Sequence, residues 1–192
     1  MIILRVKKML AILASLVAVG YGHADSDVSR DALSCSAIAY VSTLIPPDSL
    51  VEITKIPSDY IEQFYGSMSM MEQVFHAVYV ANQSNNEDLP TNRELRSIRD
   101  AELMRLSVVY EQNAESLHDL YLRCDAWGNA LSAFLESNSQ ELTGSDEEAI
   151  ALFLKAPTFN PELTFNADQR GLGQLLSDSA FGAYLETRSE TQ

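Results

Sequence analysis

The chain has 192 residues, 46% of them hydrophobic, which is enough for one domain with a substantial core. Its 13 Lys and Arg residues are outnumbered by 27 Asp and Glu residues, giving a formal net charge of −14. Binding of nucleic acid depends on clustered basic side chains, so this balance argues strongly against it. The same balance disfavours anionic membrane surfaces and favours a basic protein as partner.

The first 24 residues predict a secretory signal peptide. A positive region is formed by Arg5, Lys7 and Lys8, an apolar run covers residues 9–19, and small residues precede a cleavage site after Ala24. The run is shorter than the roughly 20 residues of a membrane-spanning helix, so an uncleaved anchor is the weaker alternative. We therefore expect a protein without a membrane anchor, periplasmic or secreted, with one domain over residues 25–192.

Cleavage makes the charge more extreme, because the signal peptide holds three basic and no acidic residues. Residues 25–192 carry 10 basic and 27 acidic side chains, a net charge of −17. Such a charge favours solubility and rapid association with a basic partner.

The chain has two cysteines, Cys35 and Cys124, which lie 89 positions apart. In an oxidising compartment two such cysteines are expected to pair, and the absence of a C-x-x-C motif favours a structural bond. The chain-entropy model assigns a loop of this length about 4–5 kcal/mol, a large part of a typical domain stability of about 5–15 kcal/mol.

Apolar residues recur with helical spacing along nearly the whole chain. The first predicted helix covers residues 28–45 and ends at Pro46-Pro47. Residues 46–57, with proline at both ends, are expected to form an ordered linker. A second helix is predicted to begin with Ser58 as its N-cap and to continue through Tyr79.

The segment 91–137 predicts one long helix. Thr91 and Glu94 have the spacing of a capping box, and no proline interrupts the apolar pattern that follows. A break into two helices near residues 112–115 is the alternative. Further helices are predicted from the "SDEE" box at 145–148 to residue 154 and over residues 171–187, with a loose tail at 188–192.

These elements predict an all-α fold, a bundle of about five helices that includes one long helix. The Cys35–Cys124 disulfide would join the first helix to the long one. Tyr121 and Trp127 would then lie opposite Ala32 and Ile38, on the buried side of both helices.

The stretch "GSMSMMEQVFH" at 66–76 is the strongest candidate for a metal site. Thioether and imidazole ligands suit copper, which makes Met68, Met71 and His76 the candidate ligands. The two methionines also continue the apolar face of a predicted helix, and methionine commonly fills irregular gaps in cores. Core packing is therefore the favoured interpretation, and we expect no bound metal or other cofactor.

No catalytic motif is present: the chain lacks G-x-S-x-G, a phosphate-binding glycine loop and a zinc-ligand pair. We therefore expect a non-enzymatic exported protein that acts by binding, such as an inhibitor, an immunity protein or an accessory protein for a basic partner. The candidate partner-binding residues are Glu136, Glu141, Asp146, Glu147 and Glu148, for which solubility and helix capping are the simpler explanation.

The alternative function is binding of a small ligand or of copper in the periplasm. It would use a pocket in the bundle lined by Tyr65, Met68, Met71, Tyr79, Tyr110, Tyr121 and Trp127. A cavity above about 300 Å³ would favour this alternative, whereas a filled core would oppose it.

Overall fold

The computed structural model describes residues 26–82, 91–138 and 155–189, and over these ranges it contains helices and no strands. The helices are α2 (Ser26–Ser42), α3 (Pro47–Thr54), α4 (Ile61–Asn82), α5 (Asn92–Ser137) and α7 (Ala167–Ser189), with a 3-10 turn, η1 (Ser58–Tyr60). The all-α prediction, including the long helix and the disulfide, is confirmed. The short helix predicted at 145–154 lies outside the described residues.

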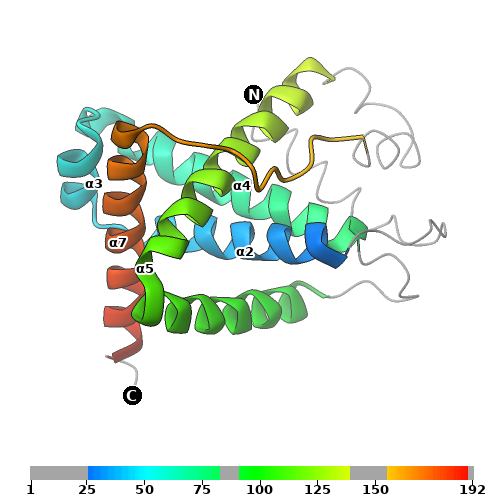
Figure 1. The fold of residues 1–192 in the computed structure, drawn as a ribbon, viewed down its shortest axis with the longest axis horizontal. Helices are drawn as coiled ribbons and strands as arrows, with labels where there is room; N and C mark the ends of the chain where they lie inside the picture. Colours follow the sequence, from blue (N-terminus) through cyan, green and yellow to red (C-terminus); the bar gives the residue numbers. More distant parts are fainter. Residues whose placement is uncertain (1–25, 83–90, 139–154, 190–192) are drawn as a thin grey trace.

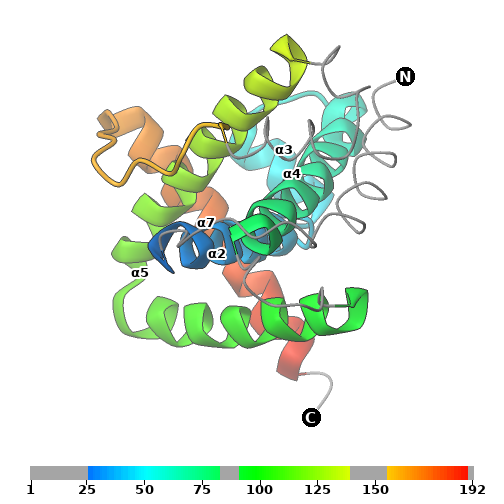
Figure 2. The same cartoon turned by 90° about the vertical axis from the view of Figure 1, so that its right-hand side faces the viewer.

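Helix α2 is the centre of the bundle. It packs against α4 and α5, while α7 packs against α5 and contacts α2 and α3 (Figures 1 and 2). Six α2 residues are completely buried: Ala32, Cys35, Ser36, Ala37, Val41 and Ser42. An apolar helix surrounded on several sides supplies the common core against which the amphipathic helices bury their own apolar faces.

The predicted disulfide joins α2 to α5. The Cα atoms of Cys35 and Cys124 are 5.1 Å apart, and the two residues are 0% and 2% exposed. One turn before Cys124, the Tyr121 hydroxyl lies 2.9 Å from Ser42 Oγ on α2. On the other side, the Trp127 ring packs against Phe75 of α4, with centroids 5.1 Å apart. The bond therefore lies at a junction of α2, α4 and α5.

Trp127 also fixes the segment that leads to α7. Its Nε1 donates a hydrogen bond to the Pro157 carbonyl oxygen at 2.6 Å, and the Phe159 ring meets the indole edge-on with centroids 5.5 Å apart. A buried indole N–H needs an acceptor, so this bond satisfies it while holding the approach to α7 against α5.

Helix α5 begins and bends as the sequence indicates. The capping box is present: Thr91 Oγ1 accepts a hydrogen bond from Glu94 N, and Glu94 Oε2 accepts one from Thr91 N. The helix bends at Asn113, whose φ of −157° and ψ of 77° are not helical, so α5 consists of two helical halves. Asparagine competes with the helical backbone for hydrogen bonds, which makes it a favourable residue for such a break.

The predicted linker 46–57 is wrong in part, because residues Pro47–Thr54 form helix α3. Proline is tolerated in the first turn of a helix, where its missing N–H would have no helical partner. Leu50 of α3 is completely buried, so burial of this side chain stabilises the short helix. The helix ends at Lys55, which adopts the left-handed conformation with φ of 59°.

Three helix boundaries also differ from prediction. The first helix ends at Ser42 rather than near residue 45, and Ser58 starts η1 instead of capping α4. Helix α7 begins at Ala167, four residues earlier than predicted. Asn166 Oδ1 accepts from Gln169 N at 2.9 Å, and Gln169 Oε1 accepts from Asn166 N at 3.0 Å. This reciprocal pair is a capping box built from amides, and it explains the early start.

Two glycines permit close helix packing. A Cβ atom at Gly128 of α5 would lie 2.5 Å from Met71 Sδ of α4, and one at Gly173 of α7 would lie 2.6 Å from the Leu122 side chain. Both glycines therefore leave the space that a neighbouring side chain fills, which positions α4 and α7 closely on α5.

Candidate functional site

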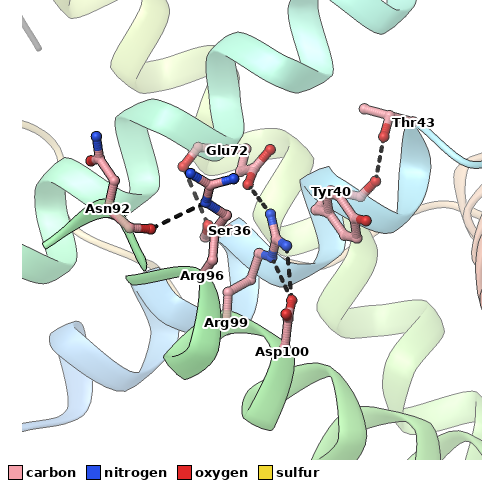
Figure 3. Close-up of polar contacts among 8 residues, drawn as sticks. All are labelled: Ser36, Tyr40, Thr43, Glu72, Asn92, Arg96, Arg99 and Asp100. Atoms are coloured by element: carbon pink, nitrogen blue, oxygen red, sulfur yellow. Dashed lines mark hydrogen bonds and ion pairs between the residues drawn. The ribbon is translucent and has the colours of Figure 1, made fainter. Parts of the chain in front are cut away.

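A cluster of charged side chains joins α2, α4 and the N-terminal half of α5 (Figure 3). At its centre, Arg99 of α5 donates to Glu72 Oε1 of α4 at 2.5 Å and to Asp100 Oδ1 at 2.8 and 3.1 Å. Its guanidinium carbon lies 3.7 Å from the centre of the Tyr40 ring of α2. With its side chain only 9% exposed, Arg99 connects three helices through charge-assisted hydrogen bonds and a cation–π contact.

A second buried charge lies one turn further along α5. Glu102 is 8% exposed and accepts a hydrogen bond from Ser34 Oγ of α2 at 2.5 Å. It also accepts hydrogen bonds from Arg105 Nη2 at 2.6 Å and from Arg105 Nε at 2.9 Å. The negative charge of Glu102 is thus compensated by Arg105, and both carboxylate oxygens accept hydrogen bonds. The two groups around Arg99 and Glu102 hold α2, α4 and α5 together through buried and partly buried charge pairs.

His76, one of the three candidate metal ligands, lies on α4 one turn beyond Glu72. Its Nε2 is buried and has no hydrogen-bond partner among the described residues. Burial lowers the pKa of His76 to about 4, and the positive charge of Arg99 acts in the same direction. The imidazole is therefore neutral at ordinary pH and belongs to the surroundings of Arg99.

The lowered pKa of His76 predicts a pH-dependent stability. Between pH 6.5, the ordinary value, and pH 4, the unfolded chain binds a proton that the folded chain does not. The free energy of unfolding therefore falls as pH falls through this window, and we expect His76 to account for a loss of about 2 kcal/mol between pH 7 and pH 5. Urea unfolding of the wild type and of His76→Gln at both pH values measures it.

The variant should lose less stability than the wild type over the same interval, by about 2 kcal/mol. Because both proteins share every other titrating group, the difference between them isolates His76. An imidazole that titrates near pH 6.5 in the folded protein, measured by NMR, would contradict the prediction.

Met68 and Met71, the other two candidate ligands, line a small pocket beside the disulfide. Cys35, Cys124 and Tyr121 also line it, and its volume is about 20 Å³. That volume holds about one water, far below the roughly 300 Å³ of a small-molecule site. Met71 is 8% exposed, and its sulfur fills the space above Gly128. The two methionines pack at the α4–α5 contact, and His76 is not among the residues of this pocket.

Nor do other ligand types gather elsewhere in the described ranges. Within residues 26–82, 91–138 and 155–189, no group of three or more His, Cys, Asp and Glu side chains is placed to share a metal ion. The structure thus brings two of the three candidate ligands together and separates the third.

A polar contact between α5 and α7 was not foreseen from the sequence. His118 Nε2 lies 2.9 Å from Asp178 Oδ1, and the Tyr110 hydroxyl also bonds Asp178. Burial, followed by this hydrogen bond, raises the pKa of Tyr110. The Tyr110 ring stacks on Phe181, with centroids 5.3 Å apart. Since Tyr110 and His118 lie on opposite sides of the bend at Asn113, α7 holds the two halves of α5 in their relative orientation.

Of the predicted acidic partner-binding residues, only Glu136 is described. It is exposed near the end of α5, while Glu141, Asp146, Glu147 and Glu148 lie outside the described residues. The structure instead places four exposed carboxylates on α3, η1 and the start of α4, which we call the acidic corner: Asp48, Glu52, Asp59 and Glu62.

The segment of the chain that carries the acidic corner also includes an exposed aromatic residue, Tyr60. Tyr60 lies between Asp59 and Glu62 and is 57% exposed. Helix α3 contacts α4, and η1 continues directly into α4, which starts on the side of α3 and runs across the molecule (Figure 1). Lys55 is the only basic residue between Asp48 and Glu62. Tyrosine is enriched at protein interfaces, and the rim around the buried centre of an interface is polar.

Fold and surface together define an all-α, disulfide-linked protein with an acidic face. Comparison with known proteins gives no match to any family model, to any curated protein or to any solved structure.

Proposed function

We propose that this is an exported, non-enzymatic helical protein that acts by binding a basic protein partner through the acidic corner. The observation that carries the proposal is that Tyr60 is exposed and that Asp48, Glu52, Asp59 and Glu62 are exposed on α3, η1 and the first turn of α4, which adjoin it. Carboxylates around a partner site steer a basic partner and accelerate association, while an aromatic side chain supplies buried contact area.

Export is supported by the disulfide. The Cys35–Cys124 bond is compatible with a periplasmic or secreted protein. Together with the predicted signal peptide of residues 1–24, it supports a location in the periplasm or outside the cell. In residues 26–82, 91–138 and 155–189, no helix is both long and apolar enough to cross a membrane.

The partner class follows from chemistry and compartment. Many secreted toxins and cell-wall hydrolases are basic, and a small acidic protein that covers one of them would serve as an inhibitor or an immunity protein. A net charge of −17 over residues 25–192, from 10 basic and 27 acidic side chains, supports this class over an accessory role toward an acidic partner.

Neutralising the acidic corner tests the proposal. The variant D48N/E52Q/D59N/E62Q is expected to slow association with the basic partner by at least about ten-fold at low salt, because long-range attraction sets the rate. Tyr60→Ala should instead accelerate dissociation, since it removes contact area. The partner is captured from the exported fraction at low ionic strength. Association and dissociation rates are then measured with the partner immobilised on a sensor surface.

A matched control removes the same charge from elsewhere. The variant of Glu115, Glu162, Asp168 and Glu186, all exposed and all changed to their amides, alters the net charge equally. It should slow association much less than the corner variant. Equal effects of the two variants, or no partner captured at low salt, would contradict the proposal.

A further inference from the structure

The N-terminal half of α5 exposes an apolar stripe on the side away from the core. Met104 is 52% exposed and Val108 is 49% exposed, although both are large apolar side chains. Ser97 and Ala101 precede them on the same exposed side. The spacings 97–101–104–108 are 4, 3 and 4 residues, the pattern by which a helix presents one seam to a second helix. We call these four residues the α5 seam.

The opposite side of the same helix half is already occupied. Arg99, Leu103 and Leu106 are buried there. In Figures 1 and 2 this half of α5 lies below α2, and the end of α7 extends past it. Its limits are the start at Asn92 and the bend at Asn113, so the straight segment is about 30 Å long at 1.5 Å per residue. The α5 seam is thus a straight surface of several turns.

Two exposed charges of opposite sign lie near the ends of the α5 seam. Arg93 lies one turn before Ser97, and Glu111 lies one turn after Val108. When two copies of this helix lie antiparallel, each Arg93 meets the partner's Glu111. When they lie parallel, like charges meet at both ends, which is unfavourable.

Side-chain sizes favour the same orientation. The small residues Ser97 and Ala101 occupy one half of the α5 seam, and the larger Met104 and Val108 occupy the other. In the antiparallel pairing Ala101 lies opposite the partner's Met104, and Ser97 opposite the partner's Val108. Each large side chain then meets a small one, as close helix packing requires.

We propose that the α5 seam is the contact of a symmetric antiparallel dimer, formed with a second copy of this chain. Such a two-fold contact is the commonest way for identical chains to associate. One helix half buries less area than the roughly 800 Å² per partner of a standard interface, so the dimer is weak, with a dissociation constant on the order of 100 µM. The strong negative charge of both copies opposes association, and added salt therefore strengthens the dimer.

Sedimentation equilibrium of the exported, disulfide-bonded protein tests the proposal from about 10 µM to 1 mM, a range set by the expected affinity. The wild type should be monomeric at the low end and largely dimeric at the high end. M104E/V108E should weaken dimerisation at least about ten-fold, because it places four carboxylates in one contact. L172E/L175E is the matched control, since Leu172 and Leu175 are exposed to a similar degree on α7, and it should leave dimerisation within about two-fold of the wild type.

Charge exchange tests the orientation. Arg93→Glu should weaken the dimer by placing two carboxylates together, and R93E/E111R should restore it to within about three-fold of the wild type. A protein that stays monomeric at 1 mM, or a dimer that M104E/V108E leaves unchanged, overturns the proposal. Failure of R93E/E111R to restore a weakened dimer overturns the antiparallel arrangement. None of these outcomes depends on the acidic corner.

Discussion

The substitution C35A/C124A is expected to lower the free energy of unfolding by about 4–5 kcal/mol. The disulfide closes a loop across 89 positions, and its loss lets the unfolded chain reach many more conformations. Both cysteines are buried at the junction of α2, α4 and α5, so the substitution also leaves a small void. Urea unfolding followed by Trp127 fluorescence measures the change.

Reduction provides the control that changes no residue. Wild-type protein unfolded in the presence of a reductant should show the same loss in the free energy of unfolding as the variant. The two losses should differ by no more than about 1 kcal/mol, the cost of the small void that only the variant contains. If C35A/C124A does not fold, the reduced wild type supplies the measurement alone. A loss below about 1 kcal/mol in both cases would show that the bond contributes little.

Arg99→Met is expected to cost about 3 kcal/mol of stability. The substitution removes the charge that compensates partly buried Glu72 and the cation that stacks on Tyr40, while its length preserves much of the packing. An unpaired buried carboxylate is costly, whereas an apolar pair of similar volume is tolerated. Urea unfolding at neutral pH measures the loss.

Two further variants separate charge from packing. R99M/E72M should regain at least half of the lost stability, because no unpaired charge remains. Arg96→Met, on the exposed side of the same helix, where Arg96 donates to the Asn92 carbonyl oxygen, should change stability by less than about 0.5 kcal/mol. If R99M were as stable as the wild type, the Glu72 carboxylate would have to be well solvated without Arg99, and the prediction would be wrong.

Features that depend on neighbouring residues were predictable from the sequence. Helical periodicity indicated the all-α fold, the Thr91–Glu94 spacing indicated the start of α5, and the compartment indicated the disulfide. Helix α3 was missed because Pro46 and Pro47 were interpreted as a break, although proline also begins helices. The "NADQ" capping box before α7 was present in the sequence and was overlooked.

Contacts between helices were not predictable in the same way. Arg99 and Glu72 are 27 residues apart, and His118 and Asp178 are 60 residues apart. Each pair depends on how two helices cross, which local spacing does not encode. The surroundings of His76 depend on such a crossing too, because the positive charge of Arg99 on α5 acts on the imidazole of α4.

The disulfide also determines how the molecule bears mechanical load. Helices α3 and α4 and the N-terminal half of α5 lie within the closed ring between Cys35 and Cys124. Tension applied between the two ends of the chain passes through the sulfur atoms and bypasses these helices. The ring withholds a length of about 300 Å from extension, since each residue spans about 3.5 Å when fully stretched. Helix α7, outside the ring, bears the load directly and resists it by its packing on α5 and its contacts with α2 and α3.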